Sequence, residues 1–164
     1  MILVGGRRNR PPFFSVITEG GGGTLLIYTL LLYGHIATAI FGFVASGGLA
    51  VAALIQRTRG SLPNSFWRWQ AAVQINTLLL AVFGTSLFLM GGRPKVILHI
   101  LYGAIALLTI LVQRAVGTDG AMLEGMWPKK EGRAAVNIAW VAFGLNAFLW
   151  AIYGRGLTTG FFGF

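Results

Sequence analysis

Four long apolar segments constrain the fold of this chain more than any other feature of its sequence. They cover residues 24–56, 66–90, 95–113 and 134–153. A helix needs about 20 mainly apolar residues to cross the hydrocarbon core of a bilayer. Glycine, proline and charged residues separate the segments, as in "GGRPK" between the second and the third. This pattern predicts an all-α protein, an integral membrane four-helix bundle.

The segments also divide the chain into regions. We expect an N-terminal extramembrane segment over residues 1–23, the four-helix domain over 24–155 and a short C-terminal tail over 156–164. As a helix, the first apolar segment of about 33 residues would be roughly 50 Å long, whereas the hydrocarbon core is about 30 Å thick. This helix must therefore tilt, project from the membrane, or break near Gly47 and Gly48.

Composition and charge agree with a membrane protein. Hydrophobic residues make up 55% of the chain and charged residues 10%, whereas a soluble domain has about 25% charged residues. The net charge of +9 comes from short basic clusters between the apolar segments, which are typical of membrane-flanking loops. The chain has no stripe of basic residues with interleaved aromatic residues, so nucleic-acid binding is not indicated. We therefore expect membrane lipids as partners, no nucleic acid, and a multi-pass protein of the bacterial cytoplasmic (inner) membrane.

Several kinds of chemistry lack the residues that they require. The chain has no cysteine, which excludes disulfides, thiolate catalysis and cysteine-bound metal sites. Its four acidic residues all lie outside the apolar segments, so paired-carboxylate catalysis and proton transfer through buried acids are not supported. We expect no enzymatic activity from the chain on its own, and either an electron-transfer or an accessory role.

The two histidines are the main chemical lead, because each lies inside an apolar segment. With four spans, the first and third helices run in the same direction. His35 lies 22 residues before Arg57, about 33 Å along a helix, and His99 follows Lys95 by four residues. Both histidines are therefore expected near the same membrane surface. The first and third helices of a four-helix bundle commonly lie on a diagonal, which leaves space between them.

A haem fits this expected arrangement. Two neutral imidazoles from facing helices can hold a haem b iron for electron transfer. The flat macrocycle requires small residues near its ligands, and surface cations suit its propionates. The predicted site therefore consists of the metal ligands His35 and His99, with Gly42, Gly103, Arg93, Lys95 and Arg155 as further cofactor-binding residues.

Other interpretations remain open. The histidines could bind the magnesium of a (bacterio)chlorophyll, or bind no cofactor and only hydrogen-bond within the bundle. Met90 could serve as a ligand together with a histidine, in a His/Met haem or in a copper site. Small residues recur every fourth position from Gly34 to Ala50, which favours close helix packing or a flat ligand.

Polar residues in the apolar segments also need partners. A hydrocarbon environment offers none, so we expect these side chains to face the bundle interior and bond between helices, or to contact a quinone head group. They are Gln70, Gln74 and Thr77 in the second segment and Asn137 and Asn146 in the fourth.

Three stretches of the sequence also resemble a known architecture. A histidine in the first segment is followed by "QINTLLLAVFG" (Gln74 to Gly84), a short Gly/Pro turn and "LHILYG" (Leu98 to Gly103). Over residues 34–106 this order resembles one four-helix half of haem A synthase and, more distantly, four-helix membrane cytochromes b of the b561 type. The resemblance implies that His35 and His99 are haem ligands. His35 is followed by isoleucine where the synthases often have arginine, and the acidic residue expected for synthase catalysis is missing. These departures favour a one-haem electron carrier, or a bundle that has lost its cofactor, over a synthase.

Two functions remain as hypotheses. The first is a haem b electron-transfer protein or subunit, with quinone as a possible redox partner. The second is a non-catalytic accessory subunit of a larger respiratory or photosynthetic membrane complex, which would bind lipid, pigment and partner helices.

Overall fold

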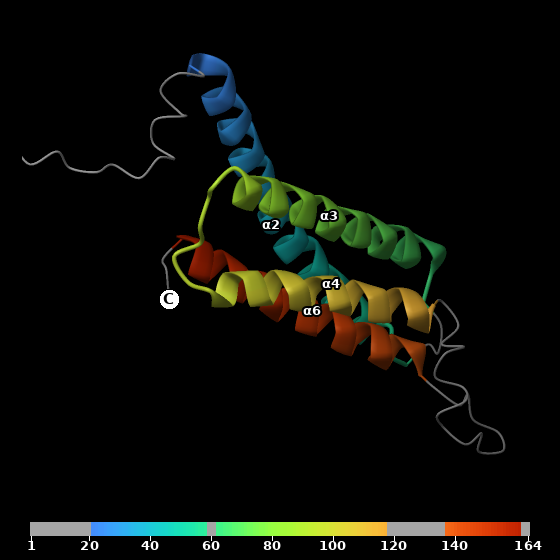
Figure 1. Ribbon diagram of the computed structural model, residues 1–164. Helices are drawn as coiled ribbons and strands as arrows, with labels where there is room; N and C mark the ends of the chain where they lie inside the picture. Colours follow the sequence, from blue (N-terminus) through green and yellow to red (C-terminus); the bar gives the residue numbers. More distant parts are fainter. Residues whose placement is uncertain (1–20, 59–61, 118–136, 162–164) are drawn as a thin grey trace, which may run out of the picture.

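The computed structural model describes residues 21–58, 62–117 and 137–161, and these form four helices (Figure 1). All four are long and apolar enough to cross a membrane, which confirms the predicted all-α, four-helix membrane fold. The helices are α2 (Gly21–Ile55), α3 (Asn64–Leu89), α4 (Leu98–Val116) and α6 (Ile138–Phe161).

The helices pack in the cyclic order α2, α3, α4, α6. α2 packs extensively against both α3 and α6, whereas α4 packs mainly against α6 and less extensively against α3. Between α2 and α4 the described backbone makes no comparable contact, so these two helices occupy one diagonal of the bundle. This agrees with the arrangement expected for the first and third spans.

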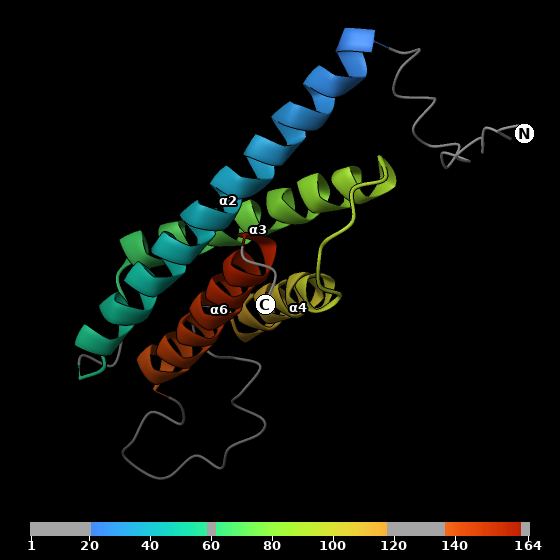
Figure 2. The ribbon, with the colours of Figure 1, turned by 90° about the vertical axis from the view of Figure 1, so that its left-hand side faces the viewer.

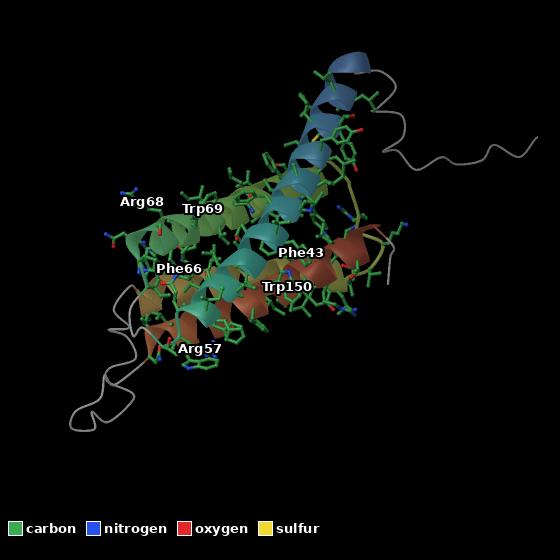
Figure 3. The ribbon with its side chains drawn as sticks, turned by 180° about the vertical axis from the view of Figure 1, so that it is seen from behind. Phe43, Arg57, Phe66, Arg68, Trp69 and Trp150 are labelled. Atoms are coloured by element: carbon green, nitrogen blue, oxygen red, sulfur yellow. The ribbon has the colours of Figure 1, made fainter. Side chains whose placement is uncertain are left out.

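α2 is one continuous helix and does not break at Gly47 and Gly48. A β-carbon added to Gly47 would lie 2.9 Å from Cδ1 of Trp150, so the glycine leaves room for the indole of α6. One turn earlier, Phe43 stacks on the same indole with ring centroids 5.5 Å apart (Figure 3). The glycine pair therefore serves helix packing, and the excess length of α2 is accommodated elsewhere.

The N-terminal part of α2 extends beyond the other helices (Figures 1 and 2). Its 35 residues correspond to roughly 52 Å. The Tyr28 hydroxyl lies 3.3 Å from the position of a β-carbon added to Gly92, so Tyr28 is level with the turn between α3 and α4. The preceding residues lie past this turn, where Leu25 and Leu26 are each 63% exposed. α2 therefore projects beyond the other helices, and of the expected alternatives only the break near Gly47 and Gly48 is wrong.

The ends of α6 differ from the predicted fourth span. The helix continues to Phe161, past the expected end at Tyr153 and into the expected tail. Asn137 precedes its first turn and accepts a hydrogen bond from the Ala139 amide at 3.1 Å, in the manner of an N-cap. Asn137 was expected inside the bundle, which is wrong: it is exposed, and its Nδ2 donates to the Arg57 carbonyl at 2.9 Å.

Polar and apolar side chains are distributed as in a protein surrounded by lipid. Large apolar side chains cover the outside of the helices, with Leu89 78% and Ile97 75% exposed. Polar side chains are buried between the helices, and several of them are less than 10% exposed. These are Ser46, Gln70, Asn76, Thr77, Thr109, Gln113, Asn146 and Thr159. Such an interior gives polar side chains hydrogen-bond partners that the hydrocarbon core of a bilayer does not offer.

Candidate functional site

The structure brings His35 and His99 together at one end of the bundle. His35 lies in α2, and His99 lies in the first turn of α4, across the diagonal. Their ring centroids are 6.0 Å apart, and the ring planes are inclined at 58°. Both side chains are half-buried. We call this the histidine end of the bundle; it also contains the turn between α3 and α4.

His35 is held by α3. Its Nδ1 lies 3.2 Å from the Leu80 carbonyl oxygen. A carbonyl can only accept a hydrogen bond, so Nδ1 carries the proton and Nε2 keeps its lone pair. Gly84, one turn after Leu80, makes this contact possible: a β-carbon added there would lie 3.0 Å from Cε1 of His35. The missing side chain leaves the imidazole room beside the carbonyl.

His99 is held by α6 in the same way. Its Nδ1 lies 3.1 Å from the Gly156 carbonyl oxygen and 3.3 Å from Oγ1 of Thr159. A β-carbon added to Gly160, one turn after Gly156, would lie 3.3 Å from Cε1 of His99. His99 therefore also has a protonated Nδ1 and an Nε2 lone pair.

The two halves of the bundle thus repeat one arrangement. In each antiparallel helix pair, the first helix supplies a histidine and the second supplies a carbonyl with a glycine four residues later. The partners of His99 were not predicted, because Gly156 and Gly160 lay in the expected C-terminal tail. A glycine at the depth of each histidine, on the following helix, is the signal that points to them.

The predicted glycines of the site have different surroundings. A β-carbon added to Gly103, one turn after His99, would meet nothing within 4 Å. Gly42 instead packs directly against the Tyr153 ring on α6. Farther along the same small-residue face of α2, Ser46 is fully buried and Ala50 is 6% exposed. Beyond Gly42, this face therefore packs against helices.

The three predicted cations lie near the histidine end, and all three are exposed. Arg93 donates to the Phe88 carbonyl at 2.8 Å and to the Gly92 carbonyl at 3.1 Å, and its guanidinium lies 4.1 Å from the Phe88 ring centroid. Arg93 thus caps the C-terminal end of α3 through its side chain. Lys95 lies in the turn before α4, and Arg155 directly precedes Gly156, whose carbonyl accepts the hydrogen bond from His99. Met90 is the C-cap residue of α3.

The donor set restricts what the histidine pair can bind. Within the described parts of the chain, no group of three or more His, Cys, Asp or Glu side chains comes together. Two imidazoles alone do not complete the tetrahedral site that zinc requires. They would suffice as the protein ligands of a metal whose other ligands come from a macrocycle. With about 2 Å from metal to each nitrogen, two such rings have centroids roughly 6 Å apart.

Buried polar side chains at mid-depth join three helices. Asn76 of α3 donates to the Thr38 carbonyl of α2 at 2.9 Å. The Thr77 hydroxyl lies 2.8 Å from the Tyr153 hydroxyl of α6. For Thr77, the contact confirms the expectation that polar groups of the second span bond between helices, whereas Asn76 was not among the residues named.

Comparisons of the chain with protein-family models, with curated proteins and with solved structures find no match in any of the three.

Proposed function

We propose that this chain is a membrane cytochrome of the b type that holds one haem between His35 and His99 and transfers electrons in a bacterial cytoplasmic membrane. The observation that carries the proposal is the histidine pair itself. The ring centroids are 6.0 Å apart, and each Nδ1 contacts a backbone carbonyl. In this proposal the two Nε2 atoms would ligate the iron.

The protein contributes position and electron density to the ligands. A hydrogen bond from Nδ1–H to a carbonyl fixes the orientation of an imidazole and raises the basicity of its other nitrogen. The Leu80 and Gly156 carbonyls act on His35 and His99 in this way. Bound haem supplies an iron that takes up and releases one electron. Lys95 and Arg155, exposed at the histidine end, are suited to pair with the propionates.

Haem is favoured over the alternative cofactors. The magnesium of a chlorophyll usually takes one protein ligand, so it would use only one imidazole of the pair, whereas haem iron can take both. A bare transition metal would need further protein ligands, and the described residues bring no third strong ligand to the histidines. Iron within a macrocycle needs only the two ligands that the bundle offers.

Absorption spectroscopy of the purified protein tests the proposal. We expect one haem per chain and the narrow visible band of low-spin haem after reduction. His35→Ala and His99→Ala should each abolish this spectrum, because each removes one axial ligand. Gln74→Ala is the control, since it changes a half-buried polar side chain in α3 and should retain the haem.

Rescue separates ligand loss from misfolding. His35→Gly and His99→Gly leave space for free imidazole, which should restore the low-spin spectrum if the bundle is intact. A wild-type protein that stays colourless when expressed with ample haem, or that keeps its spectrum in both alanine variants, would contradict the proposal.

The projecting part of α2 favours a second candidate, an accessory subunit of a larger membrane complex. Residues before Tyr28 extend past the turn between α3 and α4, yet Leu25 and Leu26 are apolar and exposed. Because this part of α2 extends past the bundle, its apolar side chains are available to the helices of a partner. Solubilisation in a mild detergent followed by native mass measurement tests this role. A monomer would count against it, and a stoichiometric complex would support it.

A further inference from the structure

Three amide side chains join three helices at the end of the bundle opposite to the histidines. Gln70 of α3 donates from Nε2 to Oε1 of Gln113 in α4 at 2.8 Å. Asn146 of α6 donates from Nδ2 to Oε1 of Gln70 at 2.7 Å. We call these three residues the amide cluster. Gln70 thus uses both its amide nitrogen and its amide oxygen, and the chain of hydrogen bonds ends at Gln113 on one side and at Asn146 on the other.

Among the residues that the structure describes, each end of the amide cluster leaves one polar atom without a partner. These atoms are Nε2 of Gln113, a donor, and Oδ1 of Asn146, an acceptor. The side chains are deeply buried, with Gln113 7% and Asn146 1% exposed. Exchanging the amide nitrogen and oxygen of Gln113 or of Asn146 does not remove the mismatch. The exchange would place two donors together at Gln113, or two acceptors together at Asn146, where each now bonds to Gln70. Buried polar groups are almost always paired in native proteins, so a partner is expected here.

Both residues line one small pocket between α3, α4 and α6. The pocket is partly open to the outside, and its volume is about 10 Å³, which is the room that about one water-sized group needs. The remaining wall is apolar and includes the Trp67 indole, Val116, Ile138 and Leu145, and none of the lining residues is charged. The pocket can thus take a single oxygen atom, while the apolar wall can contact the carbon atoms attached to it.

We propose that this pocket binds the hydroxyl group of a lipid-soluble phenol or alcohol. One hydroxyl satisfies both ends of the amide cluster, because its oxygen accepts from Nε2 of Gln113 while its hydrogen is donated to Oδ1 of Asn146. A carbonyl or an ether oxygen would satisfy only Gln113, and an anion would meet no cation in the pocket wall. A quinol or a diacylglycerol carries the required group. The proposal does not depend on haem binding.

A matched pair of ligands tests the pocket in the full-length protein in lipid nanodiscs. We expect 4-hexylphenol to bind about ten-fold more tightly than 4-hexylanisole by equilibrium dialysis, because only the phenol donates a hydrogen bond. Asn146→Leu should abolish this preference, and Gln113→Met should weaken both ligands. Gln74→Met is the control, because Gln74 lies one turn from Gln70 but does not line the pocket.

Two further arms identify the source of the hydroxyl and separate this site from the histidines. Tighter binding of decylubiquinol than of decylubiquinone supports a quinol, and tighter binding of a diacylglycerol than of its acetylated form supports a lipid alcohol. His35→Ala should leave the phenol preference unchanged. Equal binding of phenol and anisole to the wild-type protein would overturn the proposal and leave only a trapped water. This comparison needs no variant, so a misfolded variant does not prevent the decision.

Discussion

Gly84 and Gly160 set how closely each imidazole approaches its carbonyl. A β-carbon at Gly84 would lie 3.0 Å from Cε1 of His35, and one at Gly160 would lie 3.3 Å from Cε1 of His99. Gly84→Ala must therefore displace its histidine more than Gly160→Ala. Loss of such an outer contact typically weakens metal binding by about 10-fold or more. We expect weaker haem retention in both variants, with the larger effect in Gly84→Ala, measured by haem transfer to an acceptor protein.

Gly144→Ala is the matched control for Gly160→Ala in the same helix. A β-carbon at Gly144 would meet nothing within 4 Å. This substitution should leave haem retention unchanged and stabilise α6 by up to about 1 kcal/mol, because alanine favours a helix more than glycine does. If all three variants retain haem equally well, the two glycines do not position the histidines.

The site residues differed in how well the sequence could reveal them. His35 and His99 stood out because ionisable residues are rare in apolar spans. Leu80 and Gly156 act through backbone carbonyls, which every residue carries, so their sequence identity gave no signal. Gly42 was expected beside the cofactor and instead contacts Tyr153. Which side of a helix meets which neighbour depends on rotation about its axis, and a nearly uniform apolar surface does not encode that rotation.

At the scale of the helices, Gly42 controls the contact between α2 and α6. A β-carbon there would overlap the Tyr153 ring, which is 4% exposed. We expect Gly42→Ala to lower the free energy of unfolding by about 1–3 kcal/mol, because the rings and helices must shift to accommodate the methyl group. Unfolding in increasing SDS measures the change. Gly48→Ala is the control, since a β-carbon there would meet nothing within 4 Å; equal stability of the two variants would contradict this role.

The Tyr153 hydroxyl links α6 to α3. Oγ1 of Thr77 donates to the Val73 carbonyl, so Tyr153 donates to Oγ1 of Thr77 at 2.8 Å. Tyr153→Phe removes this hydrogen bond while keeping the ring. We expect a loss of about 1 kcal/mol in stability, again measured by SDS unfolding. The control is Tyr102→Phe, because Tyr102 is a half-buried tyrosine of α4. An equal loss of stability in both variants would show that the contact with Thr77 contributes nothing specific.

Helix existence followed from the sequence more reliably than helix ends. Each apolar segment became one helix, because about 20 apolar residues are stable in a bilayer only when all backbone groups are paired. The end of α6 was missed since "GRGLTTG" contains three glycines and an arginine. In the structure, Thr159 donates to the Arg155 carbonyl and packs near His99, so tertiary contacts accompany the extra turns. Those turns contain the partners of His99.

For the whole molecule, a cofactor held by His35 and His99 would join α2 to α4, the diagonal pair of helices that carries both histidines. These helices make no close backbone contact with each other, and α4 packs only sparsely against α3. Haem binding should therefore stabilise the bundle by linkage, by about 4 kcal/mol when free haem is 1,000 times its dissociation constant. It should also slow hydrogen exchange in the first turns of α4, where His99 lies near the helix end.

Hydrogen exchange with and without haem distinguishes this bridging from simple surface binding. Protection should appear in α2 around His35 and in α4 around His99 together, because one ligand joins both helices. His35→Ala should remove the protection of α4 even though the substitution lies in α2, and His99→Ala should do the reverse. The turn at the amide cluster end of α4, near Val116, should change least, because it lies more than four helical turns from His99. Protection confined to one helix would mean that the histidines do not share a ligand, however close their rings lie.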